Sequence, residues 1–243
     1  MLFSPAMVSD VVDLHEFYGS SLGQMARRLI RRRVRRIWPS LAGQRVLGFG
    51  YATPFLRPFL GDAERVIAIM PAAQGVMRWP ADEPGLVSLA DESDLPLPDL
   101  SVDRVLLVHA LEHSEQLRPL LREVWRVMAD GGRLLAVAPN RRGIWARLDR
   151  TPFGQGLPYT VGQLSRVLRE NMFTPIQSTA ALLMPPTTSR FAQAWAPAWE
   201  ELGERWLQTF AGVVMIEASK QVYGAVPVSG ARKRRRVYVP IPG

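Results

Sequence analysis

The sequence contains no cysteine among its 243 residues, which excludes disulfide bonds and metal sites with thiolate ligands. Histidine is scarce as well, because only His15, His109 and His113 occur, and we expect no metal centre. No apolar run reaches the length of about 18 residues that a transmembrane helix needs. The N-terminal segment has early acids and no basic start, so no signal peptide is predicted. These absences favour a cytoplasmic protein.

The net charge of +8 is concentrated in two terminal clusters. Seven arginines fall within Arg27–Arg36, and five basic residues form Arg232–Arg236. From residue 37 onward, without the second cluster, 18 basic residues stand against 19 acidic ones, so the remainder is nearly neutral. This distribution predicts an N-terminal arm (residues 1–39), one domain (residues 40–226) and a flexible basic tail (residues 227–243).

The arm contains a predicted amphipathic helix at residues 21–38. Its apolar residues recur at three- and four-residue spacing: Leu22, Met25, Ala26, Leu29, Ile30, Val34, Ile37 and Trp38. Ser21 and Gln24 have the spacing of a capping box, and Pro39 ends the helix. The arginines then fill the opposite face. That face is either simply solvated or, together with Arg232–Arg236, binds a polyanion such as nucleic acid or a membrane surface.

The rest of the chain alternates between apolar strands and amphipathic helices. Strands are predicted at 45–50, 65–70, 86–89, 102–109, 133–138, 176–184 and 211–219. Helices are predicted from Ser114 to Gly131, at 160–171 and at 189–209. This alternation is typical of parallel strand–helix–strand units, and it predicts an α/β, doubly wound sheet. Ligands of such sheets bind in the crevice at the carboxyl ends of the strands.

Three ordered segments carry a resemblance to a known family. They are ADESDLPLPDLSVD at 90–103, HALEH at 109–113 and RVMADGGRLLA at 126–136. In this order and spacing they resemble the type 11 family of class I S-adenosylmethionine-dependent methyltransferases. The resemblance implies a Rossmann-like sheet of seven mostly parallel strands with an antiparallel last strand. It also implies S-adenosylmethionine as the cofactor.

The family's glycine loop is altered in this chain. After its first strand the family has an acid–x–Gly–x–Gly–x–Gly loop, and the corresponding segment here is Gly48-Phe49-Gly50-Tyr51-Ala52-Thr53-Pro54. Gly50 is retained. Gly48 replaces the acid, and Ala52 and Pro54 replace the second and third glycines.

The family's ribose-binding carboxylate after the second strand is also missing, because Met70 stands there. Asp91 matches the family's acid near the adenine. Each lost hydrogen bond to a charged group is expected to weaken binding about ten- to a hundredfold. The resemblance places cofactor contacts at nine residues: Gly48, Phe49, Gly50, Tyr51, Ala52, Met70, Asp91, Glu92 and His109.

Candidate catalytic and substrate-binding residues follow the fourth and fifth strands. His109 and His113 are candidate general bases, although a packed or capping histidine is the more common outcome. Arg141, Arg142, Trp145 and Tyr159 are candidate contacts to an acidic or aromatic substrate, or else they belong to a solvated loop.

Three functions are compatible with these patterns. The first is a methyltransferase of unknown substrate that works by in-line displacement. The second is a catalytically inactive methyltransferase that acts as a binding or regulatory subunit for a protein partner. The third is a polyanion-binding protein that uses its terminal arginines.

Overall fold

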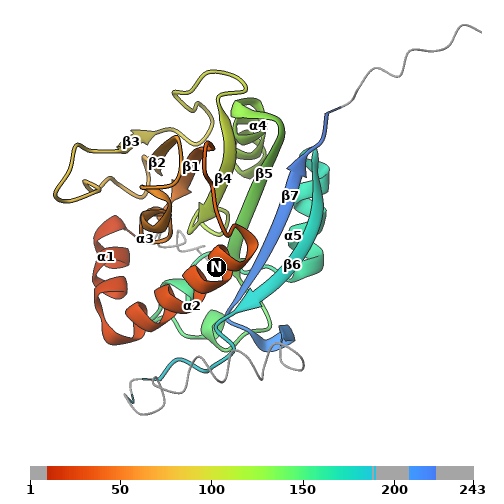
Figure 1. Ribbon diagram of the computed structural model, residues 1–243. Helices are drawn as coiled ribbons and strands as arrows, with labels where there is room; N and C mark the ends of the chain where they lie inside the picture. The colour runs from red at the N-terminus through yellow and green to blue at the C-terminus, as the bar shows by residue number, and fades with distance from the viewer. Residues whose placement is uncertain (1–9, 188, 190–207, 223–243) are drawn as a thin grey trace, which may run out of the picture.

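The computed structural model describes residues 10–187, 189 and 208–222, and within them one seven-stranded sheet lies between two layers of helices (Figure 1). The strand order is β3–β2–β1–β4–β5–β7–β6. The strands are β1 (Arg45–Gly50), β2 (Arg65–Pro71), β3 (Val87–Ala90), β4 (Val102–Val108), β5 (Met128–Pro139), β6 (Phe173–Ala181) and β7 (Val213–Lys220). Strands β1 to β5 pair in parallel, whereas β7 is antiparallel to both of its neighbours. The predicted doubly wound sheet with an antiparallel last strand is confirmed.

The two faces of the sheet are covered by different parts of the chain (Figure 1). Helices α1 (Val11–Gly19), α2 (Ser21–Ile37) and α3 (Thr53–Leu56) pack on one face. Helices α4 (Leu117–Val127) and α5 (Val161–Glu170) pack on the other. Alternate strand residues serve the two layers, as the period of two requires: Leu106 and Val108 face α1–α3, whereas Val105 and Leu107 face α4 and α5.

Short 3-10 turns connect several of these elements. They are η1 (Arg57–Phe59), η2 (Trp145–Arg147), η3 (Pro152–Gly154) and η4 (Gln208–Phe210). The predicted helix at 189–209 falls largely outside the described residues, as does the predicted basic tail at 227–243.

The start of α2 differs from the prediction by one residue. Ser20, not Ser21, is the N-cap, and its hydroxyl accepts a hydrogen bond from the Gly23 backbone N–H at 3.1 Å. The Gln24 side chain donates instead to the backbone oxygen of Gly19. Ser20 lies at the corner between α1 and α2, where its extended backbone suits an N-cap. The sequence did not predict α1, so it did not indicate that Ser20 lies between two helices and caps the second.

Two other helix starts test the capping signals. The capping box at the start of α5 is confirmed, because the side chains of Thr160 and Gln163 each bond the other's backbone N–H. Helix α4 begins two residues later than predicted: Gln116 rather than Ser114 is its N-cap, and the Ser114 hydroxyl makes no capping bond. The helix ends at Val127, and the chain enters β5 at Met128 rather than at residue 133.

Side-chain hydrogen bonds join the end of α2 to β7 and the start of β1 to β4. The Trp38 indole N–H donates to Glu217 Oε1 on β7 at 3.0 Å. The Arg45 guanidinium at the start of β1 makes two 2.9 Å hydrogen bonds with the carboxylate of Asp103 on β4. Such two-pronged pairs are geometrically specific, so this one fixes β1 against β4.

In the described ranges, none of the helices combines the length and the apolar character that crossing a membrane requires.

Candidate functional site

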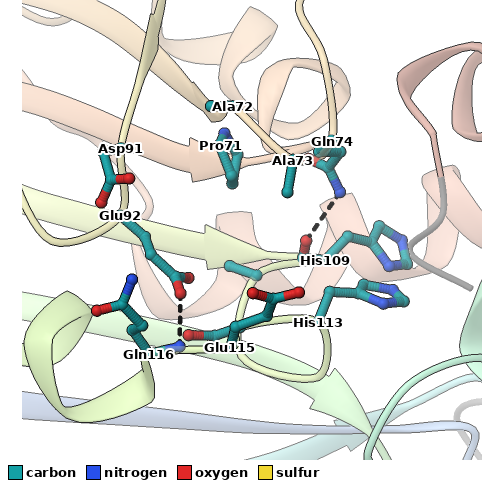
Figure 2. A pocket seen from close by; sticks show the side chains of 12 residues that line it. Pro71, Ala72, Ala73, Gln74, Asp91, Glu92, His109, His113, Glu115 and Gln116 are labelled. Atoms are coloured by element: carbon teal, nitrogen blue, oxygen red, sulfur yellow. Dashed lines mark hydrogen bonds between the residues drawn. The ribbon is translucent and has the colours of Figure 1, made fainter. Parts of the chain in front are cut away.

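The carboxyl ends of β2, β3 and β4 surround a cavity of about 100 Å³ (Figure 2). Its walls come from the loop after β2 (residues 71–74), from Asp91 and Glu92 after β3, and from residues 109–116 after β4. In a parallel sheet this edge is where ligands bind. Three of the nine predicted cofactor contacts, Asp91, Glu92 and His109, line the cavity.

The loop after β2 is bonded across this edge to the end of β4. The Gln74 side-chain amide donates to the backbone oxygen of His109 at 3.1 Å (Figure 2). His109 itself has a left-handed backbone, with φ of 50°. The backbone oxygen of Gln74 in turn accepts from the N–H of Val11, at the start of α1. Helix α1, the β2 loop and β4 are thus joined around one edge of the cavity.

His109 is the centre of a buried chain of hydrogen bonds. Its Nε2 atom lies 2.7 Å from the hydroxyl of Tyr18, and its Nδ1 atom lies 3.1 Å from Glu112 Oε1. A neutral ring that donates from Nδ1 to the Glu112 carboxylate accepts the Tyr18 hydroxyl at Nε2. Burial, followed by the nearby Glu112, raises the pKa of Tyr18 well above its ordinary value. Tyr18 is therefore a neutral hydrogen-bond donor at physiological pH.

Several buried polar atoms around the cavity lack partners within the described part of the chain. They are Gln74 Oε1, Glu112 Oε2, His113 Nε2 and Ser114 Oγ. Burial of such atoms is unfavourable unless they are hydrogen-bonded. Gln74, His113 and Ser114 line the cavity, whereas Glu112 does not. The three unpartnered atoms of the lining residues are a reason to expect a polar ligand or ordered water there.

His109, Glu112 and His113 also lie close enough to hold a metal ion. Their ligand atoms all lie within 4.8 Å of one another. Both ring nitrogens of His109 are already hydrogen-bonded, so a metal would first have to displace Glu112 or Tyr18. Burial lowers the pKa of His113, which keeps this ring neutral and able to accept a hydrogen bond.

The two acids after β3, Asp91 and Glu92, form hydrogen bonds with different segments. Asp91 accepts hydrogen bonds from the backbone N–H and the hydroxyl of Ser93, and these bonds lower the pKa of its carboxyl. Glu92 reaches the start of α4 and accepts the backbone N–H of Gln116 at 2.6 Å (Figure 2). Glu92 therefore caps α4, which Gln116 does not do with its own side chain.

The altered glycine loop is closely packed. An added Cβ at Gly48 would overlap the Leu56 side chain and lie 2.8 Å from the Ala52 Cβ, so the place of the family's acid is filled. Gly50 has φ of 81°, the left-handed conformation that favours glycine. Phe49 is buried in the α4–α5 layer, on the other face of the sheet from Tyr51. Phe49 therefore lies away from the predicted cofactor contact.

Aromatic and apolar side chains occupy the crevice beyond this loop. Tyr18 of α1 stacks on Tyr51 with ring centroids 5.6 Å apart, and Phe153 packs against His109. The exposed fractions of Tyr18, Tyr51 and Met70 are only 3%, 4% and 1%. The structure therefore brings the predicted residues Tyr51, Met70 and His109 into one region, but as parts of a packed core.

The structure brings Arg141 and Tyr159 together, because the backbone N–H of Arg141 donates to the backbone oxygen of Tyr159 at 3.0 Å, but Trp145 does not share a surface with them. Arg141 and Arg142 are exposed, whereas Tyr159 is half-buried and donates to the backbone oxygen of Leu111. Trp145 is fully buried, and its indole N–H donates to the backbone oxygen of Met184. Trp145 is thus a core residue, which corrects its prediction as a substrate contact.

Comparisons with known proteins point to one family. Residues 47–136 match the model of a methyltransferase domain of the type 11 kind. The chain is 29% identical over 139 residues to the ubiquinone/menaquinone biosynthesis C-methyltransferase UbiE of Rubrivivax gelatinosus, covering 55% of this chain and 53% of that protein. It is 27% identical over 183 residues to the 27-O-demethylrifamycin SV methyltransferase of Amycolatopsis mediterranei, covering 69% and 64%.

Residues 47–136 of the chain are thus similar to the type 11 methyltransferase domain, and the two relatives above are methyltransferases. A crystal structure of such an enzyme from Thermotoga maritima, a possible histamine N-methyltransferase, shares the fold. It has a TM-score of 0.61 and 17% identity, and the match covers 87% of this chain and 96% of that one. The chain spans less than two thirds of the length of the curated methyltransferases described above.

S-adenosylmethionine is the cofactor of this family, and the two ends of the crevice differ in how they suit it. At the adenine end there is a cavity, with Asp91 at its rim and unpartnered polar atoms in its wall. Its volume of about 100 Å³ is well below the roughly 300 Å³ of a typical ligand pocket. At the ribose and methionine end, Met70, Tyr51 and Tyr18 are almost fully buried, and Tyr18 stacks on Tyr51. Binding of the whole cofactor thus requires these side chains to move.

Sequence reasoning did not single out two residues of this candidate site, Tyr18 and Glu112. Glu112 lies three residues after His109 in the recognised HALEH segment, a spacing that brings the two side chains together. Val11, Leu14 and Tyr18 have the apolar spacing of a helix, which was a usable signal for α1. Nothing in the sequence signals the bond from Gln74 to His109, because it joins two distant loops.

Proposed function

We propose that this chain is an S-adenosylmethionine-dependent methyltransferase that binds its cofactor by the adenine end first. The observation that carries the proposal is the cavity beside Asp91, where Gln74 Oε1, His113 Nε2 and Ser114 Oγ are buried without partners in the described part of the chain. A purine ring offers complementary donors and acceptors. Partners of this kind would satisfy atoms that are otherwise unfavourable to bury.

The rest of the cofactor enters only if the crevice opens. Two hydrogen bonds hold it closed, from Gln74 to the His109 backbone and between Tyr18 and the His109 ring. We infer that cofactor binding displaces Tyr18 and the 71–75 loop together, since Val11 of α1 is bonded to Gln74. The affinity is then reduced by the free energy of opening.

Methyl transfer by in-line displacement depends chiefly on the alignment of acceptor, methyl group and sulfur. A base is needed only when the acceptor must lose a proton. His109, oriented by Glu112, is the residue placed for that role once Tyr18 moves away from Nε2.

Calorimetric titration with S-adenosylhomocysteine tests this proposal. Asp91→Asn keeps an oxygen that can accept from Ser93 but removes the charge, and we expect about ten- to a hundredfold weaker binding. Asp94→Asn is the matched control, since Asp94 is an exposed acid in the same turn and is not among the residues that line the cavity. Equal affinities for Asp91→Asn and Asp94→Asn would refute the adenine-end site.

A second function, a catalytically inactive methyltransferase that serves as a binding subunit, is favoured by one specific observation. Leu56 and Ala52 fill the place of the family's first acid, and the buried Met70 stands in place of its ribose acid. This alternative expects no heat with S-adenosylhomocysteine at millimolar concentration for the wild type, Asp91→Asn or a Tyr18→Ala variant that empties part of the crevice. Binding by Tyr18→Ala alone would identify a closed but competent site and exclude the alternative.

The third function, weak polyanion binding through Arg27–Arg36 and Arg232–Arg236, remains a proposal with a narrower basis. Only four of the seven helix arginines are exposed: Arg28, Arg32, Arg35 and Arg36. Contacts with phosphates release counterions, so retention on heparin should fall steeply with salt. Retention that is unchanged after neutralising these four residues and removing 231–243 would exclude it.

A further inference from the structure

A second cavity, of about 230 Å³, shares no lining residue with the first. Helix α2, the segment after β1 and the segment after β2 form its walls. Four arginines line it: Arg27 and Arg31 from α2, Arg57 from η1 and Arg78 from the loop after β2. No aspartate or glutamate is among the lining residues.

These arginines lack acidic partners in the described part of the chain. None of the four forms an ion pair there, and Arg78 donates only to the backbone oxygen of Glu83. Elsewhere the protein does pair its arginines, since Arg45 is bonded to Asp103 and Arg126 to Glu123. The cavity is thus a local concentration of uncompensated positive charge.

Arg27 and Arg31 line this cavity with incompletely hydrogen-bonded guanidinium groups. They are one helical turn apart and half-buried, and the Nε atom of each is inaccessible and has no hydrogen-bond partner. Arg31 donates one bond to the backbone oxygen of Pro54 at 3.1 Å. Burial and the neighbouring charges of Arg27 and Arg57 lower the pKa of Arg31. An anion between these guanidinium groups would relieve both the repulsion and the missing hydrogen bonds.

Apolar and aromatic side chains also line this cavity. Tyr51, Met70 and Trp79 line it, and Trp79 is half-buried. Burial raises the pKa of Tyr51 to about 12, so its hydroxyl stays protonated and can donate to an acceptor. The cavity thus joins a cationic wall to a surface on which a ring can pack.

We propose that this cavity binds a small organic phosphate, with the phosphate between Arg27, Arg31 and Arg57 and an aromatic or apolar group against Trp79 and Met70. The planar guanidinium fork matches phosphate oxygens two at a time, which makes arginine the preferred residue for this ligand. A hollow of about 230 Å³ admits one phosphate with one ring, whereas duplex nucleic acid would need a broad surface. Tyr51 and Met70 are also predicted cofactor contacts, so this ligand lies beside the cofactor's predicted place. The ligand differs in chemistry from the methyltransferase cofactor, which carries no phosphate.

Calorimetric titration of the full chain with phenyl phosphate tests the proposal, and thermal unfolding is followed in parallel. We expect saturable binding to the wild type that is about ten- to a hundredfold weaker in Arg31→Gln and in Arg27→Gln. Arg28→Gln is the matched control, because Arg28 lies on the same helix, is exposed and does not line the cavity. Arg31→Lys keeps the charge but loses the fork, and it should be intermediate.

Three outcomes would overturn the proposal. The first is equal affinity in Arg28→Gln and Arg31→Gln, with all variants folded by their unliganded melting temperatures. The second is benzoate binding as tightly as phenyl phosphate, which would show a general anion site. The third is no saturable binding at all.

Two further binding measurements distinguish a phosphate on a lipid headgroup from a phosphate on a free small molecule. Phosphatidylcholine vesicles with and without phosphatidic acid present the phosphate as a lipid headgroup. Arginine-dependent binding to the acidic vesicles that phenyl phosphate competes away would identify a lipid source. Binding of phenyl phosphate without vesicle binding would identify a free metabolite, and both results support the phosphate site.

Discussion

The hydroxyl of Tyr18 lies 2.7 Å from Nε2 of His109, and this bond joins helix α1 to the carboxyl end of β4. Both residues are almost fully buried, at 3% and 1% exposure. In a methyltransferase fold this end of β4 borders the cofactor crevice. A side chain that precedes the sheet in sequence therefore completes a packed core at the place where a ligand would lie.

Replacing Tyr18 by Phe tests how much this bond contributes to stability. The change leaves the buried Nε2 atom of His109 without its partner, and we expect the free energy of unfolding to fall by about 1–3 kcal/mol. Urea unfolding at neutral pH measures it. Tyr51→Phe is the matched control, because the Tyr51 hydroxyl makes only a long 3.5 Å contact with His15. The control should change stability by less than about 0.5 kcal/mol, and similar losses in both variants would contradict the prediction.

Restoring the family's acid by Gly48→Asp should destabilise the protein. The new Cβ overlaps Leu56 and lies 2.8 Å from Ala52, and the carboxylate would be buried without a partner. We expect the free energy of unfolding, measured with urea, to fall by about 1–3 kcal/mol. Gly61→Asp controls for the loss of glycine, since Gly61 is exposed and nothing lies near its added Cβ.

A double variant separates crowding from buried charge. Leu56→Ala makes room beside residue 48, so the effects of Gly48→Asp and Leu56→Ala should not add. If crowding dominates, the double variant is more stable than the sum of the single effects predicts. Strict additivity would mean that Leu56 does not occupy the acid's place.

The sheet could be predicted from local signals, but the closed crevice could not. Strand β1 and helix α5 follow from apolar periodicity and capping residues within one segment. The crevice depends on contacts across long stretches of chain, such as Tyr18 with His109 and Gln74 with the same residue. Trp145 was predicted as a ligand contact because an aromatic residue near arginines suits a binding loop. Its burial depends on Phe153 and Met184, which local sequence does not bring near.

The phenol of Tyr51 should make the protein sensitive to alkali. Burial raises its pKa from 10.0 to about 12 in the folded state, so the native state favours the protonated phenol. The contribution of this group to stability is complete below about pH 10 and is lost as the pH rises through 12. Unfolding measured across this range should show a steeper loss for the wild type than for Tyr51→Phe. Identical alkaline profiles would show that Tyr51 is not the group responsible.

The pair of Arg45 and Asp103 should support stability at neutral pH and lose its effect in acid. Hydrogen bonds from the Arg45 side chain hold the pKa of the Asp103 carboxyl below its ordinary value of 3.8. A depressed pKa means that the contribution is present above that value and disappears as the pH falls through and below it. Because the side chains are 30% and 23% exposed, solvent screening limits the effect to about 1 kcal/mol.

Asp103→Asn tests this pair through the pH dependence of the stability difference from the wild type, and not only through the magnitude of that difference. We expect the variant to be less stable than the wild type at pH 7, and the difference to shrink steadily as the pH falls below about 4. Asp94→Asn is the control, since Asp94 is an exposed acid for which the structure shows no ion pair in the described ranges. Its stability should follow the wild type throughout. A difference between Asp103→Asn and the wild type that is constant from neutral to acidic pH would mean that the backbone hydrogen bond from Arg45 to Asp103, and not the charge, is what the substitution disturbs.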